Sequence, residues 1–73
     1  MPKFAEIAIA LPVDRTFNYS IPERLSESIA IGKRAFVPFQ NRAVVGYVVG
    51  FSADSVVLGV KEIISVIDKI IFP

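Results

Sequence analysis

At the start of the chain, bulky and small apolar residues alternate with period two, which is typical of a β-strand. Within residues 4–11, Ile7, Ile9 and Leu11 alternate with alanines, so the two sides of this strand differ in bulk. Pro12 follows and offers no backbone donor, which places it at a strand end or edge. Further strands are predicted over Thr16–Ile21, Ala35–Phe39 and Arg42–Phe51, where β-branched, aromatic or other apolar residues predominate.

Turn residues separate these runs. Pro22 comes two residues after Ser20, and proline is favoured in a first helical turn, so we expect one short helical or tight turn over Pro22–Leu25. Gly32–Arg34 indicates a turn into the third strand. Gln40 and Asn41 separate two apolar runs, and asparagine tolerates the positive φ of a tight two-residue hairpin turn.

Three residues inside the predicted strands indicate bending. Pro38 argues that the third strand lies at a sheet edge or bends there. Gly46 and Gly50 interrupt the long fourth strand, and glycines inside a strand usually mark a bulge or a sharp curl. A long curled strand is how a small sheet wraps into a barrel.

The last segment, Val60–Ile71, follows a loop expected over Ser52–Gly59 and has two interpretations. Its five isoleucines match helical spacing. Its seven β-branched apolar residues favour a strand, and Val66 would face the polar side of the helix. With this segment taken as a strand, the sequence predicts a mainly β fold: a small curled antiparallel sheet or partly open barrel of about five strands.

Composition limits the chain to one small domain, residues 1–73. Apolar residues make up 53% of it, more than so few residues readily bury. We therefore expect an excised amino-terminal piece of a longer protein, complete or truncated, with some faces covered by other parts. The longest uncharged run, 43–53, is far shorter than the ~20 residues of a membrane-spanning helix, so no membrane partner is expected.

The chemistry available to the chain is narrow. It has no cysteine and no histidine, which removes thiolate ligands, thiol nucleophiles and the usual general base. Its acids form no metal-binding or acid/base motif, so we expect no enzyme activity, no cofactor and no metal. The lack of cysteine fits a cytoplasmic location. Eight basic against seven acidic residues give a net charge of +1, so any nucleic-acid contact must be a small local site.

Phe17 and Asn18 are the candidate site, because they set an aromatic ring and a short amide side by side near a strand start. A flat ring can stack on any nucleotide base, and an amide both donates and accepts hydrogen bonds. The alternatives are that Phe17 belongs to the core, as we expect for Phe36 and Phe51, and that Asn18 caps a local turn. Lysines and arginines near the turns are interpreted as solvated surface.

The order of several segments resembles the amino-terminal domain of the replication-restart helicases of the PriA family. The segments are ALPVDRTFNYSIPE, IGKRAFVPF, GYVVGFS and LGVKEIISVID, in register from about Ile7 to Asp68. The resemblance implies a non-catalytic module that binds the 3′ end of the nascent leading strand at a stalled fork, alongside the remaining helicase domains of the same polypeptide. The helicase motor of the family lies outside this sequence.

The resemblance also implies the site residues. Phe17 and Asn18 fall on the pair that contacts the terminal nucleotide, and Lys61 falls on a basic residue of the same pocket. Asn18 replaces the usual aspartate and keeps hydrogen-bonding capacity. Gln40 replaces a glycine, so a side chain occupies space at that turn. The second hypothesis is a small β-barrel protein–protein interaction module with exposed apolar strands.

Overall fold

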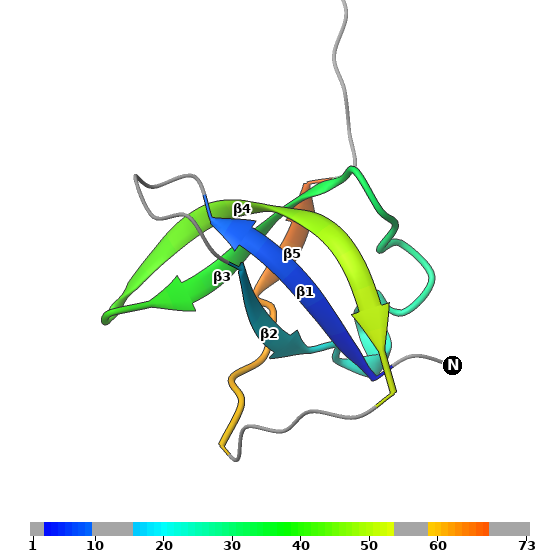
Figure 1. The fold of residues 1–73 in the computed structure, drawn as a ribbon, viewed down its shortest axis with the longest axis horizontal. Helices are drawn as coiled ribbons and strands as arrows, with labels where there is room; N and C mark the ends of the chain where they lie inside the picture. Colours follow the sequence, from blue (N-terminus) through cyan, green and yellow to red (C-terminus); the bar gives the residue numbers. More distant parts are fainter. Residues whose placement is uncertain (1–2, 10–15, 54–58, 68–73) are drawn as a thin grey trace, which may run out of the picture.

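The computed structural model describes residues 3–9, 16–53 and 59–67 of the chain, and in these ranges it is built from strands and one short helical turn. The elements are β1 (Phe4–Ile9), β2 (Thr16–Ser20), the 3-10 turn η1 (Glu23–Leu25), β3 (Arg34–Phe39), β4 (Arg42–Ser52) and β5 (Ser65–Ile67) (Figure 1). The predicted mainly β fold and the short helical turn after Pro22 are confirmed.

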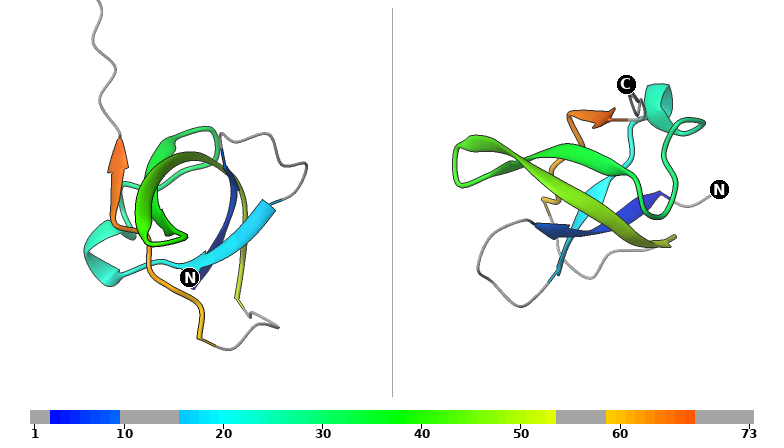
Figure 2. Two further views of the ribbon diagram at one scale, coloured as in Figure 1. Left: turned by 90° about the vertical axis from the view of Figure 1, so that its left-hand side faces the viewer. Right: turned by 90° about the horizontal axis from the view of Figure 1, so that it is seen from above.

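The five strands form one antiparallel sheet in the order β2-β1-β4-β3-β5. The sheet curls so strongly that its two edges approach each other, as the views in Figure 2 show. An isolated parallel bridge between Ser20 and Glu62 links the end of β2 to the segment that leads into β5. The result is a partly open barrel, in which the described residues span the gap with one bridge rather than a continuous ladder.

The curl has its origin in the glycines of β4. Glu6 of β1 lies opposite Gly50, but the next residue, Ile7, lies opposite Val48, so Val49 is an extra residue in the ladder. Such a bulge bends the strand and increases its twist. At Gly46 a Cβ atom would collide with a methyl group of Ile7, so the close approach of β1 to β4 requires glycine there.

The predicted two-residue hairpin joins β3 to β4. Phe39 and Arg42 form the last cross-strand pair, and Gln40 and Asn41 make the turn between them. Both turn residues have positive φ, 51° and 65° respectively, which is the pattern of a type I′ turn.

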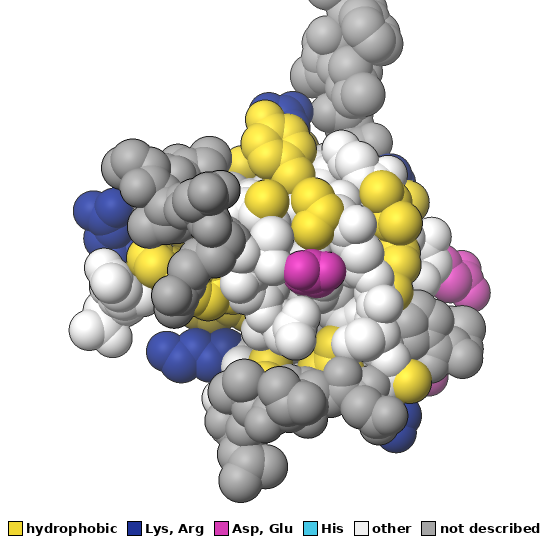
Figure 3. Space-filling view, viewed as in Figure 1, with side chains coloured by type: hydrophobic (Ala, Val, Ile, Leu, Met, Phe, Trp, Pro, Cys, Tyr) yellow, Lys and Arg dark blue, Asp and Glu magenta, His cyan; other side chains and the backbone are white. Residues whose placement is uncertain are grey.

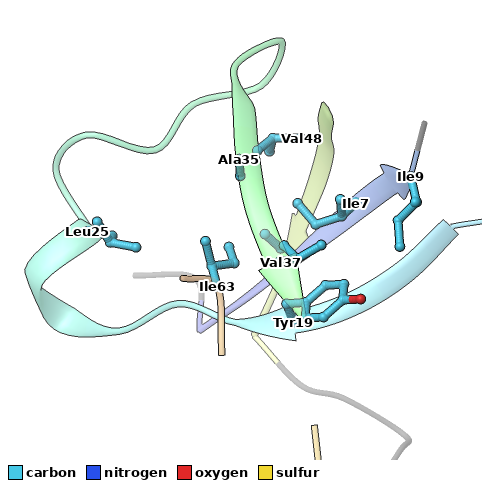
Figure 4. Close-up of a cluster of buried hydrophobic side chains, with 9 residues drawn as sticks. Ile7, Ile9, Tyr19, Leu25, Ala35, Val37, Val48 and Ile63 are labelled. Carbon is cyan, nitrogen blue, oxygen red and sulfur yellow. The ribbon is translucent and has the colours of Figure 1, made fainter. Parts of the chain in front are cut away.

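The core lies inside the curl and draws on every wall of the barrel (Figure 4). It is filled from β1 to β4 by alternating inward positions, from η1 by Leu25 and from the segment before β5 by Ile63. The buried residues are Ala5, Ile7, Ile9, Tyr19, Leu25, Ala35, Val37, Val48 and Ile63. Phe51 packs against this cluster, as predicted.

Two predictions need correction. Phe36 is not core: it lies between the inward-facing Ala35 and Val37, so its ring points outward and is 37% exposed. In the described part of Val60–Ile71, only Ser65–Ile67 forms strand, pairing with β3; residues 68–71 lie outside the described ranges. Pro38 lies beyond the stretch of β3 that pairs with β5, as expected of an edge position.

Candidate nucleic-acid interface

Phe17 and Asn18 project from opposite faces of β2. Phe17 lies opposite the fully buried Ile7 and faces the interior, whereas Asn18 lies opposite the exposed Glu6 and faces outward. The prediction that ring and amide stand side by side is therefore wrong, because successive residues of a strand alternate between its faces. Both side chains are half-buried.

The ring of Phe17 meets the ring of Phe39 from β3, with centroids 5.3 Å apart and planes inclined by 59°. This tilted geometry is one that aromatic pairs favour. The two strands are not neighbours in the sheet, so the contact crosses the barrel. We call the end of the barrel at which Phe17 and Phe39 lie its mouth. Phe17 also packs against the core cluster, so it has a structural role in addition to any role in binding.

Tyr19 makes a second contact between β2 and β3. Its hydroxyl donates a hydrogen bond of 2.8 Å to the carbonyl oxygen of Pro38. Burial raises the pKa of Tyr19, since the ionised form would lose its hydration. Tyr19 and Phe17 together hold the inner face of β2 against the end of β3.

The Asn18 side chain forms no hydrogen bond with any residue in the described ranges. Its polar atoms are not sealed from solvent, because the described side chains include no buried nitrogen or oxygen without a partner. The alternative in which Asn18 caps a turn is thus wrong for the described structure. Its neighbour across the strand pair, Glu6, instead accepts a 2.5 Å hydrogen bond from the Thr16 hydroxyl.

Lys61 lies at the other end of β2. Its carbonyl oxygen accepts a 2.9 Å hydrogen bond from the Ser20 amide, and the Ser20 carbonyl accepts one of 3.0 Å from Ile63. Lys61 is exposed and, along β2, lies roughly 10 Å from Phe17 at ~3.3 Å per residue. Lys61 therefore lies beside Ser20, two residues beyond Asn18 along β2, and is not in contact with the Phe17 ring.

Gln40 is exposed at the tip of the β3–β4 hairpin, directly after Phe39. Gln40 is therefore linked to Phe17 only indirectly: it follows Phe39, and the ring of Phe39 contacts the ring of Phe17. Sequence reasoning missed Phe39 itself. The signal that could have found it is its place beside a two-residue turn, where a bulky ring can overhang the barrel mouth.

The electrostatics of the surface are weak and mixed. On the face shown in Figure 3, lysine and arginine side chains stand apart toward the margin, and one acidic side chain lies near the centre. Among the described residues there is no cluster of acids that could hold a metal ion. No helix in the described ranges is long and apolar enough to cross a membrane.

Two comparisons with known proteins agree. The family model for the PriA 3′ DNA-binding domain (3′BD) matches residues 6–73. The replication restart protein PriA of Bacillus subtilis (strain 168) is 36% identical over 70 residues, which is 89% of this chain and 9% of that protein. The chain thus spans only a small part of the length of this relative. The family match covers nearly all of the sequence, and so the chain belongs to the 3′ DNA-binding domain family of PriA.

Proposed function

We propose that this chain binds the 3′ end of a DNA strand and is the non-catalytic, end-recognising module of a replication-restart helicase acting in the cytoplasm. The observation that carries the proposal is the accessible amide of Asn18 on an edge strand, within a chain of the PriA 3′ DNA-binding domain family. The remaining helicase domains of the same polypeptide are its proposed partners.

The edge position of β2 allows one nucleotide to contact side chains on both faces of the strand. The backbone of Ser20 points away from β1, toward Lys61 and Ile63. Because backbone direction alternates, the N–H and C=O of Asn18 point to the same free edge. A terminal nucleotide seated there meets the Asn18 backbone, the Asn18 amide from one face and the Phe17 ring from the other.

The chemistry of these groups suits a nucleotide of any sequence. Stacking on an aromatic ring contributes about 1–3 kcal/mol per base and tolerates every base. An amide offers a donor and an acceptor, and so can bond a base edge or a 3′ hydroxyl. With a net charge of +1, the isolated chain attracts DNA only weakly, so the end must be recognised by contact rather than by a general field.

A titration followed by backbone amide NMR shifts tests this proposal. A short oligonucleotide with a free 3′ hydroxyl should shift the amides of Phe17, Asn18 and Lys61 and bind better than the same strand blocked by a 3′ phosphate. The added 3′ phosphate crowds the site of the terminal nucleotide, and its negative charge is attracted only weakly by a chain of small net charge. Equal binding of the two strands excludes terminal recognition.

The second candidate is a protein–protein interaction module, and the outer face of the barrel favours it. Phe36 of β3 and Tyr47 and Val49 of β4 are 37%, 47% and 46% exposed. This second candidate is supported if the oligonucleotide causes no amide shift at Phe17, Asn18 and Lys61, while the amides of these outer residues shift with protein concentration.

A further inference from the structure

We propose that the β3–β4 hairpin is the second wall of the DNA site, in which Arg42 contacts a backbone phosphate of the strand whose terminal base lies on the Phe17–Phe39 pair. This inference rests on the proposed function and extends it to a residue that neither the sequence nor the family match singles out. The β3–β4 turn projects beyond the body of the barrel in Figure 1.

The register places Arg42 on the binding side of the hairpin. Arg42 lies directly opposite Phe39, and paired residues of antiparallel strands project from the same face with Cβ atoms about 4.5–5.5 Å apart. Phe39 in turn contacts Phe17. An arginine side chain is long enough to pass the Phe39 ring, so its guanidinium can reach a group that lies over the aromatic pair.

The Arg42 guanidinium is not committed to another contact. Arg42 is exposed, and it has no ion pair, hydrogen bond or cation–π contact with any residue in the described ranges. A planar guanidinium matches a phosphate with two parallel hydrogen bonds. The apolar ring pair and the uncommitted guanidinium beside it provide for the two parts of a nucleotide, its base and its phosphate.

The hairpin holds this arrangement in place. The type I′ turn at Gln40 and Asn41 matches the twist of its strands, which fixes the pairing of Phe39 with Arg42. The hydrogen bond from Tyr19 to Pro38 fixes the same end of β3 against β2. Arg42 is therefore presented from a rigid element.

Arg34 provides a matched control on the same pair of strands. It is also exposed, but it lies opposite Tyr47 and next to the inward-facing Ala35, so it projects from the outer face. Replacing either arginine by glutamine removes one charge and keeps most of the side-chain length. A general electrostatic field predicts equal effects, whereas a local phosphate contact predicts an effect at Arg42 alone.

The experiment measures the affinity of Arg42→Gln, Arg34→Gln and the unmodified chain for a 3′-hydroxyl oligonucleotide over a range of salt concentrations. Arg42→Gln should bind about fivefold more weakly, near the upper end for an exposed ion pair. Its plot of log affinity against log salt should be shallower by roughly 0.7, the single-strand value per phosphate contact. Arg34→Gln should match the unmodified chain in both.

An oligonucleotide with neutral methylphosphonate linkages next to its 3′ end separates the outcomes further. It should bind Arg42→Gln and the unmodified chain equally, because the contact is already lost. If the two arginine variants are equivalent on the normal oligonucleotide, the contribution is diffuse and the inference is wrong while end binding stands. If the unmodified chain binds no oligonucleotide, end binding and this inference both fail.

Discussion

The barrel carries two pairs of aromatic side chains that differ in how they are held. At the mouth, Phe17 and Phe39 are half-buried and their rings touch across strands that do not pair. On the outer face, Phe36 and Tyr47 are more exposed, and the described structure gives them no ring partner. The outer pair offers more surface, but the mouth pair is fixed in position, and a fixed platform loses less conformational entropy on binding.

The difference shows that exposure alone does not identify a recognition site in so small a domain. The strand alternation that fills the core leaves every second side chain of β3 and β4 outside. Exposed rings on such a face are an expected consequence of folding. The contact between Phe17 and Phe39 needs the curl of the whole sheet, and so it is the more specific feature.

The largest contrast is expected between the two tyrosines. Tyr19→Ala removes a ring that is 5% exposed together with its hydrogen bond to Pro38, and should cost about 3–5 kcal/mol, as for other buried aromatics. A domain of this size has little more than that in total, so the variant should unfold. Tyr47→Ala, on the outer face, should cost less than about 1 kcal/mol. Thermal unfolding followed by circular dichroism compares the two variants. Equal losses of stability would mean that the inner and outer tyrosines contribute alike, which contradicts the prediction.

The next contrast concerns DNA and compares Phe17→Ala with Phe36→Ala. Phe17→Ala should weaken binding of a 3′-hydroxyl oligonucleotide by roughly 5- to 150-fold, which corresponds to the loss of about 1–3 kcal/mol of stacking. Because Phe17 also packs against the core, it should lower the unfolding free energy by about 1–2 kcal/mol, less than for a fully buried ring.

Phe36→Ala should leave DNA affinity unchanged. Affinity is measured by fluorescence anisotropy at a temperature where both variants are folded, and folding is checked by the dispersion of amide shifts. If Phe36→Ala lost as much affinity as Phe17→Ala, Phe17 would not be a specific contact and the proposed stacking role would be wrong. If the unmodified chain bound no oligonucleotide, the result would instead support the protein-interaction alternative.

A smaller effect is expected at Lys61, which is tied through its backbone to Ser20 at the far end of β2. If it contacts phosphate, Lys61→Ala should weaken binding equally for every terminal base and make the salt slope shallower by roughly 0.7. Arg34→Gln is again the comparison from the outer face. Salt titrations with four oligonucleotides that differ only in the 3′ base provide the measurement, and a base-dependent loss would contradict a phosphate contact.

Local pattern predicted most of the fold. The alternation around Ile7 and Ile9 gave the inward face of β1, and the Gln40-Asn41 pair gave the hairpin and the positive φ at Asn41. The prediction failed at Phe36, because strand alternation was expected to place this ring on the inward face. Ala35 and Val37 occupy the interior there, which leaves Phe36 outside.

The site was less predictable than the fold, because its contacts are made over long sequence separations. The Phe17–Phe39 contact and the Ser20–Glu62 bridge depend on the curl of the complete sheet, and no local periodicity encodes them. Residue choice identified Asn18 as unusual on a strand and Phe17 as a ring that could stack on a base. That the two side chains emerge on opposite faces follows from the strand itself.

The smallest expected effect, at the hairpin tip, tests whether the mouth of the barrel is as well fixed as its ring contact suggests. Gln40 has a φ of 51°, a conformation that costs an ordinary side chain of order 1 kcal/mol and that glycine adopts freely. Gln40→Gly should therefore raise the unfolding free energy by about 0.5–1 kcal/mol, the remainder being lost to the greater backbone freedom of glycine in the unfolded chain. Gln40→Ala keeps the unfavourable φ and should give no gain, which makes it the control. Urea unfolding measures both variants. Equal stability of the glycine and alanine variants would mean that the turn relaxes in solution, and the fixed pairing of Phe39 with Arg42 would then no longer distinguish the mouth from the outer face.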